Sequence, residues 1–279
     1  MASMKTVDIF GCPLTYFDIN PSAPGPAVVY IHGNSMSAEA FRGVWSAPGL
    51  TNVRQIALNL PGHGGSGWLP KYSLEIFADI VHVFAKALGL RAPHLVGNSL
   101  GGHICVQVME RLRPSSVFLF GNPPAGKPLS AAAFLPCQAT PLLFSSGPDS
   151  DAELAPLWEA LGYTAPQAQE ACGWYRETDP AFRQMMLESV GRGEYTDELA
   201  ILSQPAAPTT FLICERDPIV SNAYIWRTLA ELHPSIATVS LDVGHVPQVE
   251  EPAHFSQVLT NHLHRHGTIA TTEATNHAP

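Results

Sequence analysis

The fold is decided by the stretch His94-Leu95-Val96-Gly97-Asn98-Ser99-Leu100-Gly101-Gly102-His103. It starts as a short apolar strand, passes through a turn of the form G-x-S-x-G, and continues into an amphipathic segment over residues 104–112. In a strand-to-helix turn this sharp, side chains at Gly97 and Gly101 would crowd the neighbouring backbone. The pattern therefore predicts that Ser99 sits at a helix N-terminus with its hydroxyl exposed, where free N–H groups favour negative charge.

Strands and helices alternate on both sides of this stretch. A continuous apolar run, typical of a strand that is buried on both faces, occupies residues 27–31, and further strands are expected over residues 53–58, 117–120, 209–214 and 237–241. A hairpin is expected over residues 5–17, and helices over 74–88, 221–232 and 252–264. This order predicts an α/β fold: a mostly parallel eight-stranded sheet with helices on both faces.

The alternation stops between residues 125 and 208, where the chain becomes rich in Ala, Pro and aromatic residues. We expect an inserted helical cap there. The predicted core therefore comprises residues 1–124 and 209–266, with the cap at 125–208. Residues 267–279 are expected to form a disordered tail.

Composition limits the classes of partner. The chain has 279 residues, 46% of them hydrophobic, and a formal net charge of −9. The acidic balance argues against nucleic acid or an anionic membrane as a partner. We expect neither a signal peptide nor a membrane span. The five cysteines are odd in number and form no C-x-x-C pair, which favours a reducing, cytoplasmic location.

Residues suited to activating a serine follow the later strands. A serine hydroxyl needs a base, a group that orients the base, and donors for the oxyanion that forms. His245 follows the last strand directly after Gly244, and Asp217 follows the preceding strand before Pro218. The order Ser, Asp, His is the one expected for this type of turn, so His245 is the predicted base and Asp217 the predicted orienting acid. Glu215 is the alternative acid.

The predicted oxyanion hole uses two backbone N–H groups. One belongs to Leu100, the residue after the serine, and the other to Asn34, in the loop after the strand at 27–31. We expect no metal or other cofactor, because the chain has no histidine and carboxylate pattern with metal-ligand spacing.

These motifs together resemble the α/β-hydrolase superfamily over nearly the whole chain to about residue 266. The resemblance is carried by His32-Gly33-Asn34, Leu60-Pro61-Gly62-His63-Gly64, the turn at 97–102, Arg216-Asp217-Pro218 and Gly244-His245. It implies a Ser99–His245–Asp217 triad and a cap between the sixth and seventh strands. Within the superfamily the chain looks most like the N-acyl homoserine lactonases of this fold, on shorter motifs such as Gly121-Asn122-Pro123-Pro124.

The expected substrate is a small carboxylic ester or lactone with an apolar acyl group. Five cap residues are predicted to bind it, namely Trp158, Tyr163, Trp174, Tyr175 and Met185. Phe134, Phe144, Leu157 and Met186 are further candidates for the same acyl pocket.

Three alternatives stay open at this stage. The turn is also similar to that of carbon–carbon bond hydrolases acting on ring-cleavage products. A perhydrolase or haloperoxidase-like activity is chemically close. A ligand receptor without catalytic activity is a third possibility. The oligomeric state is not predicted.

Overall fold

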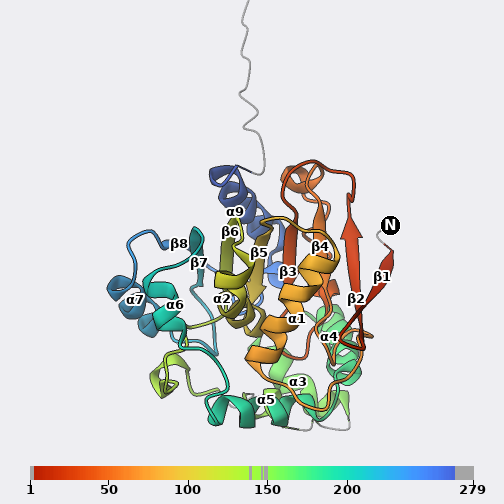
Figure 1. The fold of residues 1–279 in the computed structure, drawn as a ribbon. Helices are drawn as coiled ribbons and strands as arrows, with labels where there is room; N and C mark the ends of the chain where they lie inside the picture. Colours follow the sequence, from red (N-terminus) through yellow and green to blue (C-terminus); the bar gives the residue numbers. More distant parts are fainter. Residues whose placement is uncertain (1–2, 138–139, 146, 148–149, 268–279) are drawn as a thin grey trace, which may run out of the picture.

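The predicted strands form one eight-stranded sheet in the order β1-β2-β4-β3-β5-β6-β7-β8 (Figure 1). The computed structural model describes residues 3–137, 140–145, 147 and 150–267. Within them, β1 pairs with β2 and β2 with β4 in antiparallel fashion, and all other neighbours are parallel. The prediction of a mostly parallel sheet is confirmed. The strands are β1 Met4–Ile9, β2 Cys12–Ile19, β3 Val28–Ile31, β4 Gln55–Leu58, β5 His94–Asn98, β6 Ser116–Phe120, β7 Thr209–Cys214 and β8 Ala237–Leu241.

Helices cover both faces of this sheet. On one face lie α1 (Leu74–Ala87), α2 (Leu100–Leu112) and α7 (Asn222–Glu231). The short 3-10 helices η1 (Ala38–Phe41) and η2 (Pro48–Leu50) cover the other face together with α9 (Pro252–Arg265). The one-turn helix α8 (Pro247–Glu250) directly precedes α9. Helix α1 is capped by Ser73, whose side chain accepts a hydrogen bond from the Ile76 N–H.

Six helical segments lie between β6 and β7 in the described residues. They are η3 (Ala131–Ala133), η4 (Thr140–Leu143), α3 (Asp151–Ala160), α4 (Ala165–Glu177), α5 (Phe182–Gly191) and α6 (Glu198–Ser203). Helices α3, α4 and α5 gather at one end of the molecule, while α6 lies beside α2 (Figure 1). The insertion therefore returns to the core helix α2 before residue 208. The boundaries proposed at residues 124 and 208 stay predictions, and the expected tail lies almost wholly outside the described residues.

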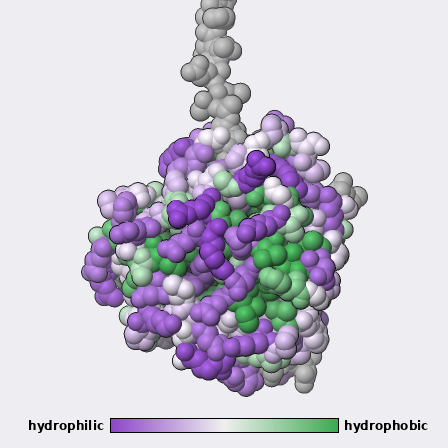
Figure 2. All heavy atoms as spheres, viewed as in Figure 1, coloured by the Kyte–Doolittle hydropathy of each residue, from purple (hydrophilic) through white to green (hydrophobic). Residues whose placement is uncertain are grey.

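The surface is mixed in character. Figure 2 shows hydrophobic areas between hydrophilic side chains on the face that carries α1 and α2. The large apolar side chains that are most exposed are Phe10, Trp68 and Met4. Single exposed apolar residues are ordinary on folded chains, so these three residues by themselves indicate no particular partner.

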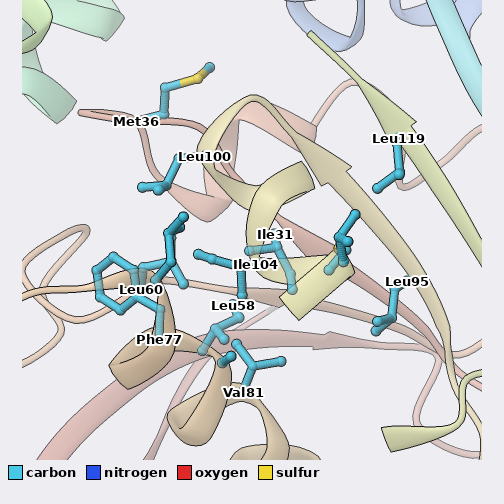
Figure 3. Close-up of a cluster of buried hydrophobic side chains, with 14 of the residues drawn as sticks. Ile31, Met36, Leu58, Leu60, Phe77, Val81, Leu95, Leu100, Ile104 and Leu119 are labelled. Carbon is cyan, nitrogen blue, oxygen red and sulfur yellow. The ribbon is translucent and has the colours of Figure 1, made fainter. Parts of the chain in front are cut away.

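Side chains of the central strands are buried on both sides of the sheet. Leu95 and Leu119 face the core under α1 and α2, whereas their neighbours Val96 and Phe118 face the core under α9. This alternation follows from the two-residue period of a strand and explains the continuous apolar runs in the sequence. Figure 3 shows the first of these cores, with Leu100 at its edge next to Met36. Strand β5 of this sheet ends at Asn98 and α2 starts at Leu100, so the sheet positions Ser99 between them.

Candidate active site

Ser99 lies on a strained turn between β5 and α2. Its φ is +51°, in a region that residues with a side chain rarely adopt. The Ser99 N–H donates to the Phe120 carbonyl at 2.9 Å, and the Ser99 carbonyl accepts from the Gly102 N–H at 2.9 Å. A Cβ atom on Gly101 would lie 2.0 Å from the Ile31 oxygen, and one on Gly97 would lie 2.5 Å from the Gly101 oxygen. The crowding predicted from the sequence is therefore present at both glycines.

The structure brings His245 and Asp217 together from the loops after β8 and β7. These strands are parallel neighbours, so their carboxyl ends meet at one edge of the sheet. His245 Nδ1 lies 2.7 Å from Asp217 Oδ2, and both side chains are buried. Because an ionised carboxylate only accepts hydrogen bonds, Nδ1 is the donor and His245 Nε2 is left as an acceptor.

The surroundings of Asp217 favour its ionised form. Its Oδ1 accepts hydrogen bonds from the N–H groups of Ile219 at 2.8 Å and Val220 at 2.9 Å. Burial raises the pKa of the Asp217 carboxyl. The attraction of His245 and the hydrogen bonds that the carboxylate accepts outweigh burial, so the pKa falls below its ordinary value. The alternative acid Glu215 is exposed to solvent and makes no hydrogen bond to His245 in the described part of the chain.

Ser99 and His245 share one cavity of about 450 Å³. Its wall also includes Asn34 and Leu100. Most of the remaining wall is apolar and includes Leu129, Phe134, Leu143, Phe144, Met186 and Val190. In the residues that the structure describes, the Ser99 hydroxyl makes no hydrogen bond, to His245 or to any other group. Bonds of this kind often form only when a substrate is in place.

The two predicted oxyanion donors also meet at this cavity. The Leu100 N–H is the first of α2, so it has no acceptor within the helix. The Asn34 N–H likewise has no acceptor among the described residues. The Asn34 side chain points to the insertion instead, where its Nδ2 donates to the Leu143 carbonyl at 2.8 Å. Backbone N–H groups, rather than the Asn34 amide, are therefore the available donors.

None of the five cap residues expected to bind substrate lines this cavity. Trp158 and Tyr163 stack on each other at 5.6 Å, and Trp158 Nε1 lies 3.1 Å from Cys172 Sγ between α3 and α4. Tyr175 donates its hydroxyl hydrogen to the Leu142 carbonyl, and Trp174 is buried within the insertion. Met185 is on α5, but the cavity is lined by its neighbours Met186, Leu187 and Val190.

That these five residues bind substrate stays a prediction, and their absence from the wall of this cavity has a physical reason. The cap helices are held together by packing their apolar side chains against one another, so most of these side chains contact other helices and few face a ligand. Of the further candidates, Phe134, Phe144 and Met186 do line the cavity, whereas Leu157 is buried outside it.

Sequence reasoning missed two polar contacts of the site. Asn98, the variable residue of the G-x-S-x-G turn, donates to the His245 carbonyl at 3.2 Å and accepts from Gln248 Nε2 at 3.2 Å. His103 lines the cavity and bonds to Glu198. Its position four residues after Ser99 was an available signal, because residues at that spacing share one helix face. Glu198 and Gln248 are too distant in sequence to have been linked to the turn.

The histidines of the two neighbouring loops have backbone partners. His32 Nε2 accepts from the Leu60 N–H at 3.1 Å, and His63 Nε2 accepts from the Ser35 N–H at 3.3 Å. Burial lowers the pKa of His32 to about 4 and lowers the pKa of His63 well below its ordinary value, so both are neutral. They support the loops that carry Asn34 and Leu60.

Two further features bear on function. No group of three or more His, Cys, Asp or Glu side chains that could hold a metal ion occurs among the described residues. In the same part of the chain, no helix is both long and apolar enough to cross a membrane.

The sequence profile of the alpha/beta hydrolase family matches residues 28–256, which is most of the chain. The protein therefore belongs to this family. In sequence it is 25% identical over 224 residues to epoxide hydrolase EphH of Mycobacterium tuberculosis, covering 68% of this chain and 95% of that protein. It is also 39% identical over 102 residues to a pimeloyl-[acyl-carrier protein] methyl ester esterase of Methylococcus capsulatus. That match spans only 36% of this chain and 37% of the esterase.

Solved structures share the fold. The N-acyl homoserine lactonase AidH, solved as a mutant complexed with N-hexanoyl homoserine, has a TM-score of 0.84 and 21% identity, covering 97% of this chain and 99% of that one. A thermophilic esterase from Thermogutta terrifontis has a TM-score of 0.75 and 19% identity, covering 95% and 99%. At these identities the likeness shows the fold alone.

Proposed function

We propose that this α/β-hydrolase is a serine hydrolase that cleaves carboxylic esters or lactones through an acyl-enzyme. The observation that carries the proposal is the shared cavity: Ser99 on its strained turn and His245, bonded to Asp217 at 2.7 Å, line the same apolar space. In this proposal Ser99 is the nucleophile, His245 the general base, and Asp217 the group that orients His245.

The proposed reaction has two halves. His245 Nε2 takes the proton of the Ser99 hydroxyl as Oγ attacks the carbonyl carbon, and the N–H groups of Leu100 and Asn34 stabilise the oxyanion. The C–O bond to the leaving group then breaks, and the leaving oxygen receives the proton from His245. In a lactone the leaving oxygen and the acyl carbon belong to the same ring, so the leaving oxygen stays covalently attached to the acyl-enzyme. Water then attacks the acyl carbonyl as His245 takes its proton, and His245 returns that proton to Ser99 Oγ as the acid leaves.

The cavity favours a substrate with an apolar acyl group. About 450 Å³ of space with a mostly apolar wall suits a small molecule, since ligand pockets are commonly of this size. Among lactones we put N-acyl homoserine lactones first, because the structure of AidH has a similar fold and the sequence motifs resemble those lactonases. The cap proposed at residues 125–208 would supply the side of the cavity that holds the acyl chain.

The likeness to epoxide hydrolase EphH raises a second reaction, which the residue at the turn disfavours. If Ser99 opened an epoxide, the product would be an ether, and water has no carbonyl to attack in an ether. An acyl group on Ser99 is an ester, which water can hydrolyse. A carbonyl substrate is therefore the better match to Ser99.

The test is proton release at constant pH by the purified protein. The substrates are N-acyl homoserine lactones of short and long acyl chain, together with p-nitrophenyl butyrate. We expect turnover that falls by at least about a thousandfold in Ser99→Ala. Ester turnover without lactone turnover would keep the serine mechanism and exclude the lactone substrate. No turnover of any of these compounds would contradict the proposal and shift weight to a carbon–carbon bond hydrolase or a receptor.

Asp217→Asn provides a second test of the mechanism. We expect kcat to fall by about 10³- to 10⁴-fold, because asparagine would not hold His245 with its proton on Nδ1. The matched control is Glu215→Gln, two residues away and exposed, which should change kcat by less than about twofold. Equal losses in the two variants would count against Asp217 as the orienting acid.

A further inference from the structure

A second histidine borders the cavity beside Ser99. His103 lies four residues after Ser99, in the first turns of α2, and both residues line the same cavity. The His103 N–H donates to the Ser99 carbonyl at 3.2 Å, so the two residues are one helical turn apart. The mechanism proposed above gives His103 no part.

The orientation of the His103 ring is fixed by a buried carboxylate. His103 Nδ1 lies 3.0 Å from both Oε1 and Oε2 of Glu198, whose side chain is fully buried. The Ala125 N–H also donates to Glu198 at 2.9 Å, and Gln107 Nε2 donates at 3.3 Å. Because every neighbour of this carboxylate is a donor, both of its oxygens act as acceptors and the ring hydrogen is on His103 Nδ1.

In the neutral imidazole, the other nitrogen of the ring is then a hydrogen-bond acceptor. In the part of the chain that the structure describes, His103 Nε2 has no protein partner, and the ring borders a cavity whose wall is mostly apolar. A polar atom in such a wall lowers the affinity for purely apolar ligands and favours a ligand that pairs with it. The matching ligand group is a hydrogen-bond donor, and an amide N–H is one.

We propose that His103 determines specificity by accepting a hydrogen bond from the N–H of an acylamino group next to the carbonyl that Ser99 attacks. The inference rests on the proposed function and deepens it. Oγ approaches the carbonyl carbon to roughly 3 Å, the nitrogen is two bonds further, and a hydrogen bond adds roughly 3 Å. Such a chain of atoms spans the one helical turn that separates Ser99 from His103. The substrate class is therefore α-acylamino esters and lactones.

The variant His103→Asn separates ligand binding from structural support. Asparagine Nδ2 can take the place of histidine Nδ1 and still donate to Glu198, but it has no atom at the position of Nε2. His254→Asn is the matched control, because its side chain is 72% exposed on α9. Thermal unfolding of both variants checks that the fold is retained.

The measurement compares two esters that differ at one atom. They are p-nitrophenyl N-butanoylglycinate and its analogue with oxygen in place of the N–H, p-nitrophenyl butanoyloxyacetate. Each kcat/KM is divided by the rate of hydrolysis by hydroxide, which removes the difference in intrinsic reactivity. We expect wild type and His254→Asn to prefer the N–H compound by about tenfold, and His103→Asn to lose that preference. No preference in wild type, or the same preference in His103→Asn, would overturn the inference.

The same pair made as lactones distinguishes this inference from the proposed function. The compounds are N-butanoyl homoserine lactone and its O-acyl analogue. If the aryl esters show the His103-dependent preference while neither lactone is opened, the inference holds and the lactone substrate fails. If esters and lactones are both cleaved with no N–H preference, the function holds and the inference fails. Failure to cleave any of the four compounds would overturn both.

Discussion

At the scale of single residues, the turn that carries Ser99 depends on the absence of side chains beside it. A Cβ atom on Gly101 would lie 2.0 Å from the Ile31 oxygen, which is far inside any normal contact and involves backbone on both sides. The neighbouring strand β3 cannot yield without disturbing its pairing with β5. Glycine is therefore required at position 101, because the atoms that a Cβ would meet belong to the backbone and cannot move aside as a flexible side chain could.

We expect Gly101→Ala to lower the free energy of unfolding by about 3 kcal/mol or more, because a single methyl group must displace backbone in a packed core. The control is Gly173→Ala in the middle of α4, where an added Cβ would meet nothing within 4 Å. Alanine there should leave stability unchanged or raise it by up to about 1 kcal/mol. Urea unfolding measures both. Similar midpoints for the two variants would refute the steric argument.

At the scale of elements, α9 is tied to the sheet by a chain of buried hydrogen bonds at the end opposite Ser99. His262 Nε2 lies 2.7 Å from Ser116 Oγ, which in turn lies 2.6 Å from His94 Nδ1. His262 Nδ1 lies 3.0 Å from Thr210 Oγ1. The chain connects α9 to the first residues of β5 and β6 and to β7. Burial, together with the nearby charge of His266, lowers the pKa of His94 to about 4 and that of His262 to about 3.

These pKa values predict loss of stability in mild acid. In the unfolded chain a histidine takes up a proton near pH 6.5, whereas the folded chain keeps His94 neutral until about pH 4 and His262 until about pH 3. The free energy of unfolding should therefore be highest above about pH 6.5. It should fall as the pH drops towards 4, by up to about 1.4 kcal/mol per pH unit for each histidine.

Urea unfolding between pH 7 and pH 4.5 measures this slope. We expect His262→Gln to reduce it, since one histidine that the fold keeps neutral has been removed. His254→Gln, on the exposed side of the same helix, should keep the slope of wild type. A slope that His262→Gln leaves unchanged would show that other groups cause the acid sensitivity.

At the scale of the whole molecule, one arginine joins the insertion to the predicted oxyanion loop. Arg183 on α5 donates from Nη1 to Ser35 Oγ at 2.9 Å and from Nε to the Ser145 carbonyl at 2.9 Å. Ser35 Oγ donates in turn to Asn34 Oδ1 at 2.7 Å. Arg183 is buried, and its guanidinium lies 3.9 Å from the centre of the Tyr175 ring. The position of Asn34 is thus linked to the packing of α5.

We expect Arg183→Lys to lower kcat/KM for esters by about tenfold, because lysine cannot bond to Ser35 and Ser145 with the fixed fork of a guanidinium. The melting temperature should also fall by a few degrees. The control is Arg176→Lys on α4, whose side chain is half exposed and pairs with Asp151. It should change kcat/KM by less than about twofold. If Arg183→Lys has the kcat/KM of wild type, α5 does not control the oxyanion loop.

The sequence by itself determined the sheet and the positions at its edge. Apolar runs of four to five residues predicted strands such as β3 and β6, because a strand buried on both faces is mostly apolar. The strand-turn-helix pattern located Ser99, and the carboxyl ends of parallel strands located Asp217 and His245. These features are local: each is defined by residues that are close in sequence or that directly follow a strand. They can therefore be recognised without knowing which distant residues they contact.

Only the tertiary structure decided which side chains surround the cavity. Trp158 and Met186 are equally apolar candidates in sequence, yet Trp158 packs against Tyr163 and only Met186 lines the cavity. Likewise, Glu198 meets His103 across 95 residues of chain. The physical reason is that packing between helices of an insertion depends on how they are rotated about their axes and how they cross. Composition and periodicity show that a helix has an apolar side, but they do not show whether that side meets a ligand or another helix.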